Sequence, residues 1–177
     1  MTNVHHCGSI PQPPEPERPT LDPDYGISTE PEGMLPWSWV DEQLAERRNL
    51  WLATARADGR PHAAPVWFVW VDQQLCFSTA PGSVKGRNLA RSPWVTAHLE
   101  SGDEVVVLEG AARLLDRAAD AELIASVDRA YHDRYGMTVS DHRGGVLYAL
   151  RPSKVLAWRE QDFPASATRW RFDLAGR

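Results

Sequence analysis

The spacing of apolar and polar residues changes several times along the chain, and each change predicts a different element. Residues 34–49, MLPWSWVDEQLAERRN, carry apolar side chains at helical spacing, with Ser38 as the expected N-cap. Residues 50–79 are rich in aromatic and β-branched residues and have a turn signal at Asp58-Gly59. This second stretch predicts three strands in a meander.

The second half of the chain predicts further strands around one long helix. Residues 94–100 and 105–115 each predict a strand, and Gly110 is the expected bulge or bend in the latter. Apolar residues at helical spacing predict the longest helix over 116–135. The runs VLYALRP, KVLAWRE and TRWRFD predict short strands. The sum is a mainly β, α+β domain of six or more antiparallel strands with inserted helices.

The first part of the chain has a different composition. Residues 1–33 hold half of all the prolines and few apolar residues, so they cannot bury enough surface to offset the entropy of ordering. We expect a disordered proline-rich tail over 1–33 and one domain over 34–177, since 177 residues suffice for one core.

Composition narrows the classes of function. No apolar run approaches the roughly 20 residues of a membrane-spanning helix, and no signal peptide is visible, so we expect a soluble cytoplasmic protein without membrane contact. Cys7 and Cys76 fit a reducing compartment. The net charge of −5 argues against a nucleic-acid partner. His5-His6-Cys7 lacks the ligand spacing of a zinc site, so no metal is expected.

The stretch FSTAPGSVKGRNLARSP, residues 77–93, is suited to an anion. A short helix that begins at Ser83 leaves backbone N–H groups free, and Ser83, Lys85 and Arg87 add side-chain donors for a phosphate. The P-loop pattern is absent. The alternative is that Ser83 is only an N-cap and the basic residues form a solvated helix face.

Three longer motifs, within 53–70, 77–95 and 98–110, resemble the pyridoxamine 5′-phosphate oxidase-like split-barrel superfamily. They read AT-x-R-x-DG-x-PH-x-x-PVWFVW, FST-x-x-x-S-x-K-x-RNL-x-R-x-P-x-V, and HLE followed by VVVLEG. This superfamily includes flavin enzymes and deazaflavin-dependent reductases. The resemblance implies a split β-barrel with a capping N-terminal helix and one longer inserted helix. It also implies a homodimer with the cofactor ring at the subunit interface.

The resemblance further implies a set of cofactor-binding residues. Ser83 and Lys85 match the family's phosphate-binding Ser-x-Lys, and Thr79 matches the residue at the end of the preceding strand. The remaining members of the set lie in the PVWF and K-x-RNL patterns and near the C-terminus, where relatives reach the partner's cofactor: Pro65, Trp67, Arg87, Asn88, Arg169 and Trp170.

One departure from the family pattern bears on the cofactor. True pyridoxamine phosphate oxidases have an Arg and a Lys where this chain has Ala64 and Val69, so the deazaflavin (coenzyme F-420) is the preferred cofactor and FMN the alternative. The expected activity is hydride transfer to a small or planar electron-poor acceptor.

Other roles within the same fold remain open, and no catalytic residue is assigned. His62 and His98 are candidates for a proton source, or are ordinary strand histidines. The same fold also admits a non-catalytic flavin carrier, or a haem protein with His62 or His98 as axial ligand.

Overall fold

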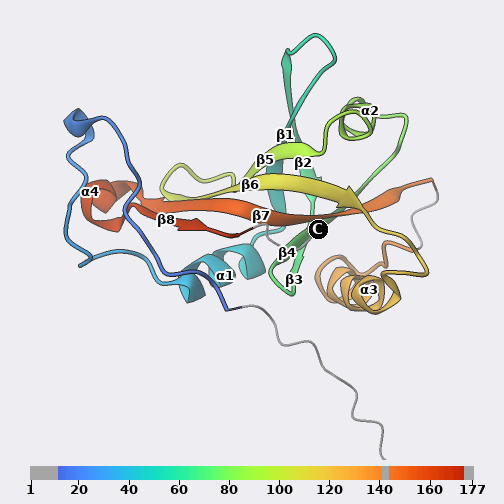
Figure 1. The fold of residues 1–177 in the computed structure, drawn as a ribbon. Coiled ribbons are helices and arrows are strands. Elements are labelled where there is room, and N and C mark those ends of the chain that lie inside the picture. Colours follow the sequence, from blue (N-terminus) through green and yellow to red (C-terminus); the bar gives the residue numbers. More distant parts are fainter. Residues whose placement is uncertain (1–11, 141–143, 174–177) are drawn as a thin grey trace, which may run out of the picture.

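One antiparallel sheet of eight strands forms the centre of the computed structural model, which describes residues 12–140 and 144–173 (Figure 1). The strand order is β2-β1-β5-β6-β7-β4-β3, and β8 pairs with β7 beside this path. The strands are β1 (Asn49–Ala55), β2 (Pro61–Trp67), β3 (Val69–Val71), β4 (Gln74–Thr79), β5 (Trp94–His98), β6 (Glu104–Leu114), β7 (Val146–Arg159) and β8 (Thr168–Arg171). The curled, open sheet confirms the mainly β, α+β fold of the split-barrel type.

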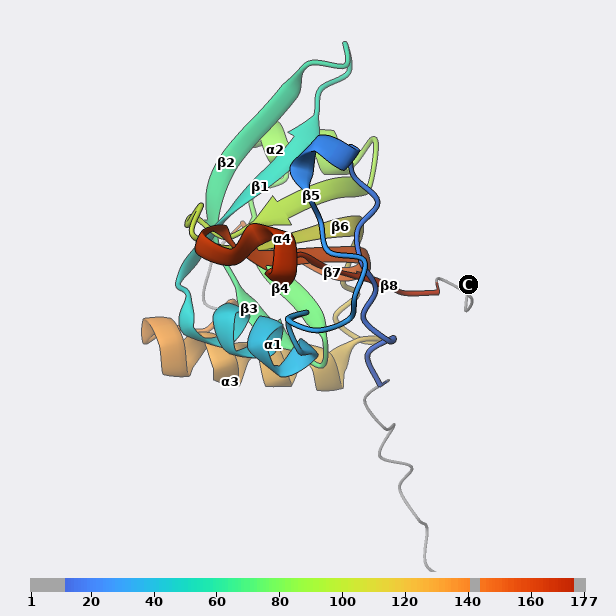
Figure 2. The same cartoon turned by 90° about the vertical axis from the view of Figure 1, so that its left-hand side faces the viewer.

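Within the described ranges, four α-helices pack around this sheet. They are α1 (Trp37–Glu46), α2 (Val84–Leu89), α3 (Ala121–Tyr135) and α4 (Phe163–Ser166), with 3-10 turns η1 (Pro23–Tyr25) and η2 (Glu160–Asp162). In Figures 1 and 2, α1 and α3 lie on one side of the β6–β7 ribbon and α2 lies on the other. The capping N-terminal helix and the longer inserted helix are therefore both present. None of the helices in the described ranges is long and apolar enough to cross a bilayer.

Burial divides the interior into two clusters. The larger cluster lies between the sheet and α1 and includes Leu44, Phe77 and Trp170. The smaller cluster lies beneath α3 and includes Cys76 and Val127. Burial raises the pKa of the Cys76 thiol to about 12, so this side chain serves as a core residue and not as a nucleophile.

The long strand β7 corrects one expectation. The runs VLYALRP and KVLAWRE were predicted as two short strands, but a single strand of 14 residues runs through Pro152 and Ser153. Pro152 lies opposite Gly110, where the β6–β7 register shifts. A proline has no N–H for the ladder, and the predicted bulge at Gly110 is the place where that loss is tolerated. A Cβ on Gly110 would lie 2.8 Å from the carbonyl oxygen of Arg151, which explains the glycine.

The start of α1 also differs from the prediction. Pro36 occupies the N-cap position with extended backbone angles, and no side chain caps the helix. Ser38, the predicted cap, lies inside the first turn. A proline fixes its own φ and ends the preceding extended segment, so the helix begins directly after it without a hydroxyl cap.

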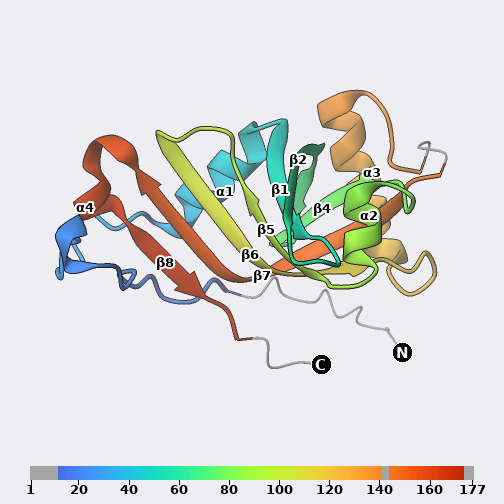
Figure 3. The same cartoon turned by 90° about the horizontal axis from the view of Figure 1, so that it is seen from above.

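Residues 12–33, which the sequence assigns to a disordered tail, follow a defined path along β8 and α4 in the structure (Figure 3). Arg18 donates five hydrogen bonds of 2.6 to 3.0 Å to backbone carbonyls of this segment and of α4 and its C-terminal end. Glu17 forms a β-bridge with Arg169 and ion pairs with Arg169 and Arg171. Polar contacts thus replace the apolar burial that the composition lacks.

Candidate cofactor site

A cavity of about 360 Å³ opens where β2, the end of β4, the start of α2 and α3 meet. Its volume falls within the roughly 300 to 1,000 Å³ of ligand pockets. The residues that line it are Pro65, Val66, Trp67, Ser78, Thr79, Ala80, Ser83, Lys85 and Tyr131. Five residues of the predicted cofactor-binding set, from three separate segments, are therefore brought together on one cavity.

Hydrogen-bond donors gather at the α2 end of this cavity. Ser83 caps the helix by accepting from the N–H of Gly86 at 3.0 Å, and its hydroxyl lies 3.0 Å from the hydroxyl of Thr79. The half-buried Lys85 ammonium has no hydrogen bond or ion pair with any described residue. A lysine without a partner beside two hydroxyls is an arrangement that binds a phosphate or carboxylate group.

The first turn of α2 requires a glycine at position 86, because the loop before the helix packs closely against it. A Cβ on Gly86 would lie 2.3 Å from the carbonyl oxygen of Ala80 and 2.8 Å from that of Pro81. These carbonyls belong to the loop that brings Thr79 next to Ser83. The glycine in the K-G-R run therefore holds the donors of the cavity close to the end of β4.

The opposite wall of the cavity is aromatic. Trp67 is 47% exposed, and Tyr131 donates a hydrogen bond of 3.0 Å from its hydroxyl to the carbonyl of Trp67. Burial raises the pKa of Tyr131, so the phenol stays neutral and remains a donor. The sequence placed Tyr131 in the buried stripe of a helix, and no signal in it pointed to a role beside the cavity.

α3 also fixes the break between β2 and β3. The Tyr135 hydroxyl accepts from the N–H of Phe68 at 3.0 Å, and its single proton is shared between the carbonyls of Phe68 and Arg48, each 2.7 Å away. Arg134 adds a hydrogen bond of 3.1 Å to the Phe68 carbonyl. These contacts satisfy the backbone where the ladder is interrupted, and they hold the adjacent Trp67 in place.

Besides the Lys85 ammonium, the cavity has a second polar group without a partner among the described residues. The Ser78 hydroxyl oxygen is buried and forms no hydrogen bond within the described part of the chain, although Ser78 lines the cavity. A buried polar atom without a partner costs free energy unless a ligand or water supplies one. This hydroxyl, the unpartnered Lys85 and the exposed face of Trp67 fit a cofactor with a phosphate and a planar ring.

Two predicted site residues on α2 point elsewhere. Asn88 is buried and donates a hydrogen bond of 2.9 Å to the Thr54 hydroxyl, which ties α2 to β1. Arg87 donates to the carbonyl of Gly82 and braces the loop before the helix. Neither residue lines the cavity. Both support the site through backbone and strand contacts, and their role as direct ligands of a cofactor stays a prediction.

The predicted C-terminal residues lie at the far end of the molecule, as the separation of β8 from α2 in Figure 3 shows. Trp170 is 0% exposed and packs edge-on against Trp37 at 5.4 Å between ring centroids. A side chain with no exposed surface cannot contact a cofactor, so this prediction is wrong. Arg169 forms an ion pair of 2.7 Å with Glu17 and is largely covered. Its predicted contact with a partner's cofactor remains a prediction.

The two candidate histidines lie outside the cavity. His62 is on β2 and His98 on β5, and neither is among the residues that line the cavity. His98 lies with its Nδ1 2.8 Å from the carbonyl oxygen of Leu99. No group of three or more potential metal ligands occurs among the described residues. The histidines therefore stay unassigned.

The open antiparallel sheet, with a cavity at the start of α2, defines a protein of the split-barrel class with a candidate cofactor site. A family model described as pyridoxamine 5′-phosphate oxidase matches residues 39–159. The chain belongs to this family.

The known proteins that are similar to this chain carry several different functional descriptions. Dihydrophenazinedicarboxylate synthase from Pseudomonas chlororaphis is 31% identical over 115 residues, which are 60% of this chain and 48% of that protein. The chain thus spans about half the length of this curated relative. A conserved hypothetical protein from Mycobacterium tuberculosis has a TM-score of 0.60 at 24% identity, over 71% of this chain and 85% of that one. An F-420 reductase has a TM-score of 0.50 at 25% identity, over 64% and 94%.

Proposed function

We propose that this protein is an oxidoreductase that uses a deazaflavin (coenzyme F-420) to transfer a hydride to a small or planar electron-poor acceptor. The observation that carries the proposal is the half-buried Lys85, unpartnered among the described residues, opposite the aromatic wall of Trp67 and Tyr131. When bound, the cofactor supplies the hydride chemistry. The protein supplies binding and orientation.

Each side of the cavity has its own part in this proposal. Lys85, Ser83 and Thr79 bind the phosphate of the cofactor through charge-assisted and hydroxyl hydrogen bonds. Trp67 presents its exposed face to the planar ring, and the Ser78 hydroxyl gains a polar partner on the ligand. The ring is thereby held at a fixed angle to its phosphate end.

The choice of cofactor rests on the strands that precede the cavity. Ala64 on β2 and Val69 on β3 stand where true pyridoxamine phosphate oxidases have basic residues, and Val69 is buried in the core. Without those two cations FMN loses part of its phosphate contacts. The similarity to an F-420 reductase at 25% identity adds support for the deazaflavin, with FMN as the alternative.

A second copy of the chain completes the site in this proposal. The outer face of β1, β2 and β5 exposes Trp51, Trp67 and Trp94, which are 37%, 47% and 53% exposed. Such aromatic surface is typical of a protein interface. Trp67 belongs both to this face and to the cavity, so a homodimer through this face covers the cofactor ring.

A parallel titration tests the proposal. The full chain is titrated with FMN and with the deazaflavin, and the intrinsic tryptophan fluorescence is followed. We expect tighter binding of the deazaflavin, and a loss of roughly ten- to one-hundred-fold in Lys85→Ala, the scale of one charge-assisted contact. Lys154→Ala is the matched control, because this lysine pairs with Glu109 outside the cavity.

The outcomes distinguish the proposed deazaflavin reductase from an FMN protein, a non-catalytic carrier and a haem protein. Equal affinities of Lys85→Ala and the parent chain for both cofactors overturn the proposed site. Tight FMN binding with weak deazaflavin binding moves the function to an FMN protein. Bound deazaflavin whose reduced form no planar acceptor oxidises identifies a carrier. A Soret band after haem addition, lost in His62→Ala or His98→Ala, identifies the haem alternative.

A further inference from the structure

The cofactor cavity lies where a β-hairpin stops pairing. β3 and β4 form a hairpin with a two-residue turn, and Val69 and Cys76 are its last pair. Hydrogen-bonded pairs recur at every second position from such a turn, so the next one in this register would be Trp67 with Ser78. The ladder nevertheless ends before them, and both residues line the cavity. The cavity is therefore an interrupted continuation of this hairpin.

The two walls of the cavity are the segments that would extend the hairpin. Residues 65–67 line one side, and residues 78–80 line the other. Pro65 would face Ala80 in the continued register, and a proline has no N–H for a ladder. The first wall pairs on its far side with β1, and the second, up to Thr79, pairs on its far side with β7. Each wall is thus held from outside, and the space between them is left open.

The hydroxyl of Tyr131, on α3, lies between the two walls. It donates to the Trp67 carbonyl at 3.0 Å. Burial raises the pKa of this phenol and the backbone N–H of Ser78 lowers it in part, so the phenol oxygen also faces that N–H. The carbonyl and the N–H that would bond each other in a continued hairpin are therefore both directed at one phenol oxygen. The tyrosine is inserted where the hairpin would have closed.

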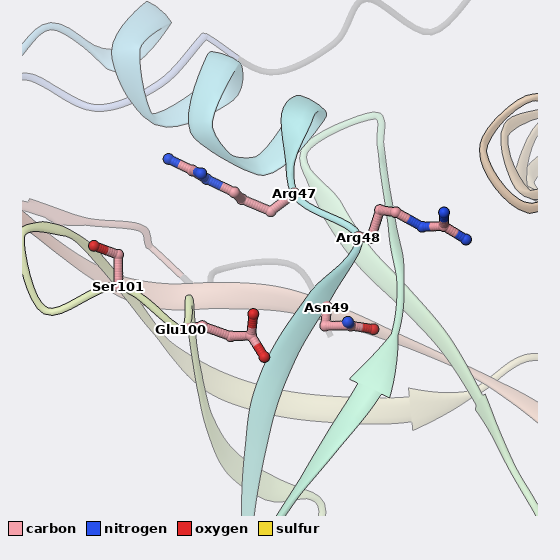
Figure 4. Close-up of a pocket in the computed structure, with 5 residues that line it drawn as sticks. All are labelled: Arg47, Arg48, Asn49, Glu100 and Ser101. Carbon is pink, nitrogen blue, oxygen red and sulfur yellow. The ribbon is translucent and has the colours of Figure 1, made fainter.

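A second tyrosine of α3 holds the Trp67 wall from another direction. The Tyr135 ring stacks on the Trp67 indole, with planes within 4° of parallel. Arg48 points away from Arg47 in Figure 4, and its guanidinium carbon is 5.5 Å from the centroid of the Tyr135 ring. Trp67 is thus fixed by α3 through its indole and through its carbonyl, so the position of this wall depends on the helix.

We propose that Tyr131 is a positioning residue of the cofactor site. Its hydroxyl keeps the two walls apart, so that one ligand reaches both the indole of Trp67 and the ammonium of Lys85. The inference rests on the proposed function, which supplies a ligand with a planar ring and a phosphate. Without the hydroxyl, the Trp67 carbonyl and the Ser78 N–H are free to bond each other, which narrows the cavity. Tyr131 acts through these groups and needs no contact with the reacting atoms.

The first test removes only the hydroxyl. The parent chain and Tyr131→Phe are titrated with FMN and with the deazaflavin, and tryptophan fluorescence is followed. Tyr131→Phe is expected to bind the preferred cofactor about three- to tenfold more weakly, the scale of one hydrogen bond. Tyr148→Phe is the matched control, because its buried ring stacks on Phe77 outside the cavity and its hydroxyl has no hydrogen bond with a described residue. Equal affinities of Tyr131→Phe and the parent chain would overturn the positioning role.

A double-mutant cycle separates positioning from a general loss of stability. If Tyr131 aligns the two ends of the cavity for one ligand, its hydroxyl matters little once the Lys85 end no longer binds. In the Lys85→Ala background, Tyr131→Phe is therefore expected to change cofactor affinity by less than about twofold. Equal losses in both backgrounds mean that the hydroxyl only stabilises the fold, and they refute the positioning role.

Failure of the cofactor site and failure of the positioning role are distinguishable. An unchanged affinity in Lys85→Ala refutes the phosphate end of the cofactor site, and with it the span that Tyr131 sets. An unchanged affinity in Tyr131→Phe, together with a loss in Lys85→Ala, leaves that site in place and refutes the positioning role alone. Thermal unfolding of each variant confirms that the compared chains are folded.

Discussion

The indole of Trp67 lies flat on the phenol ring of Tyr135, with ring centroids 4.6 Å apart and planes within 4° of parallel. The tyrosine comes from the last turn of α3 and the tryptophan from the end of β2. One face of an exposed aromatic side chain is thus fixed by a helix, and the cavity has a rigid wall.

The Tyr135 hydroxyl is expected to contribute to stability apart from this stacking. Tyr135→Phe keeps the ring and removes the bonds to Phe68 and Arg48, so we expect a loss of about 1 to 3 kcal/mol in the free energy of unfolding, measured in urea. Tyr25→Phe is the control, since Tyr25 is 59% exposed. Equal losses in both variants would contradict the role of the hydroxyl.

The turn before α2 predicts a contrast between two glycines. Gly86→Ala forces the Ala80 and Pro81 carbonyls to move, and we expect about 1 to 3 kcal/mol of destabilisation with weaker cofactor binding. Gly82→Ala places its methyl group in open space and is expected to stay within about 0.5 kcal/mol of the parent chain. Thermal unfolding and the deazaflavin titration measure the two effects. Similar results for the two variants would remove the steric argument.

Asp41 predicts a pH dependence. Burial raises its pKa above the ordinary 3.8, although the Trp70 indole donates to this carboxylate at 2.8 Å. A raised folded-state pKa means that the folded chain binds this proton more tightly. The resulting stability is present below pH 3.8 and is lost as the pH rises through the folded-state value.

Asp41→Asn is therefore expected to gain stability relative to the parent chain as the pH rises from about 3 to about 7. This pH range begins below the ordinary carboxyl pKa of 3.8 and extends well above it. Urea unfolding at several pH values measures the difference. Glu42→Gln on the same helix is the control, since Glu42 is exposed. A difference between Asp41→Asn and the parent chain that does not vary with pH would contradict the assignment.

The path of residues 12–33 predicts that Arg18 is structural. Arg18→Ala removes five hydrogen bonds to backbone carbonyls, two of them at α4 and its C-terminal end, and we expect about 1 to 3 kcal/mol of destabilisation. We also expect faster proteolysis between residues 12 and 33. Arg117→Ala on the exposed turn before α3 is the control. If the two variants are cut at the same rate, the segment does not depend on these bonds.

Much of the fold follows from local signals in the sequence. Alternation, turn residues and helical spacing predicted most of the elements, and the bulge or bend expected at Gly110 coincides with the register shift between Glu109 and Gly110. The predictions that failed depend on contacts between residues that are far apart in the sequence. VLYALRP and KVLAWRE read as two strands until Gly110 is placed opposite Pro152. Residues 12–33 read as a tail because ion pairs with distant arginines cannot be seen in local composition.

The candidate site was predictable on one side only. Ser83, Lys85 and Thr79 lie close together in the sequence, and their pattern resembles a known motif. Tyr131 and Ser78 were missed, because a tyrosine in a helical stripe and a serine in a strand carry no local signal for a cavity. The predicted cofactor contact of Trp170 was wrong. Side chains along a strand point alternately to its two faces, and the side chain of Trp170 lies on the face that is buried in the core.

The long strand β7 has a consequence for synthesis of the chain. Among the strands that the structure describes, β7 alone joins the β3–β4 ribbon to the rest of the sheet, since Leu75 pairs with Leu150 while β6 pairs with the other edge of β7. Strands β1 to β6 are translated first, and their two groups cannot be joined until β7 has left the ribosome. Native tertiary structure is therefore completed only after nearly the whole chain has been made, and the nascent chain exposes unpaired strand edges until then.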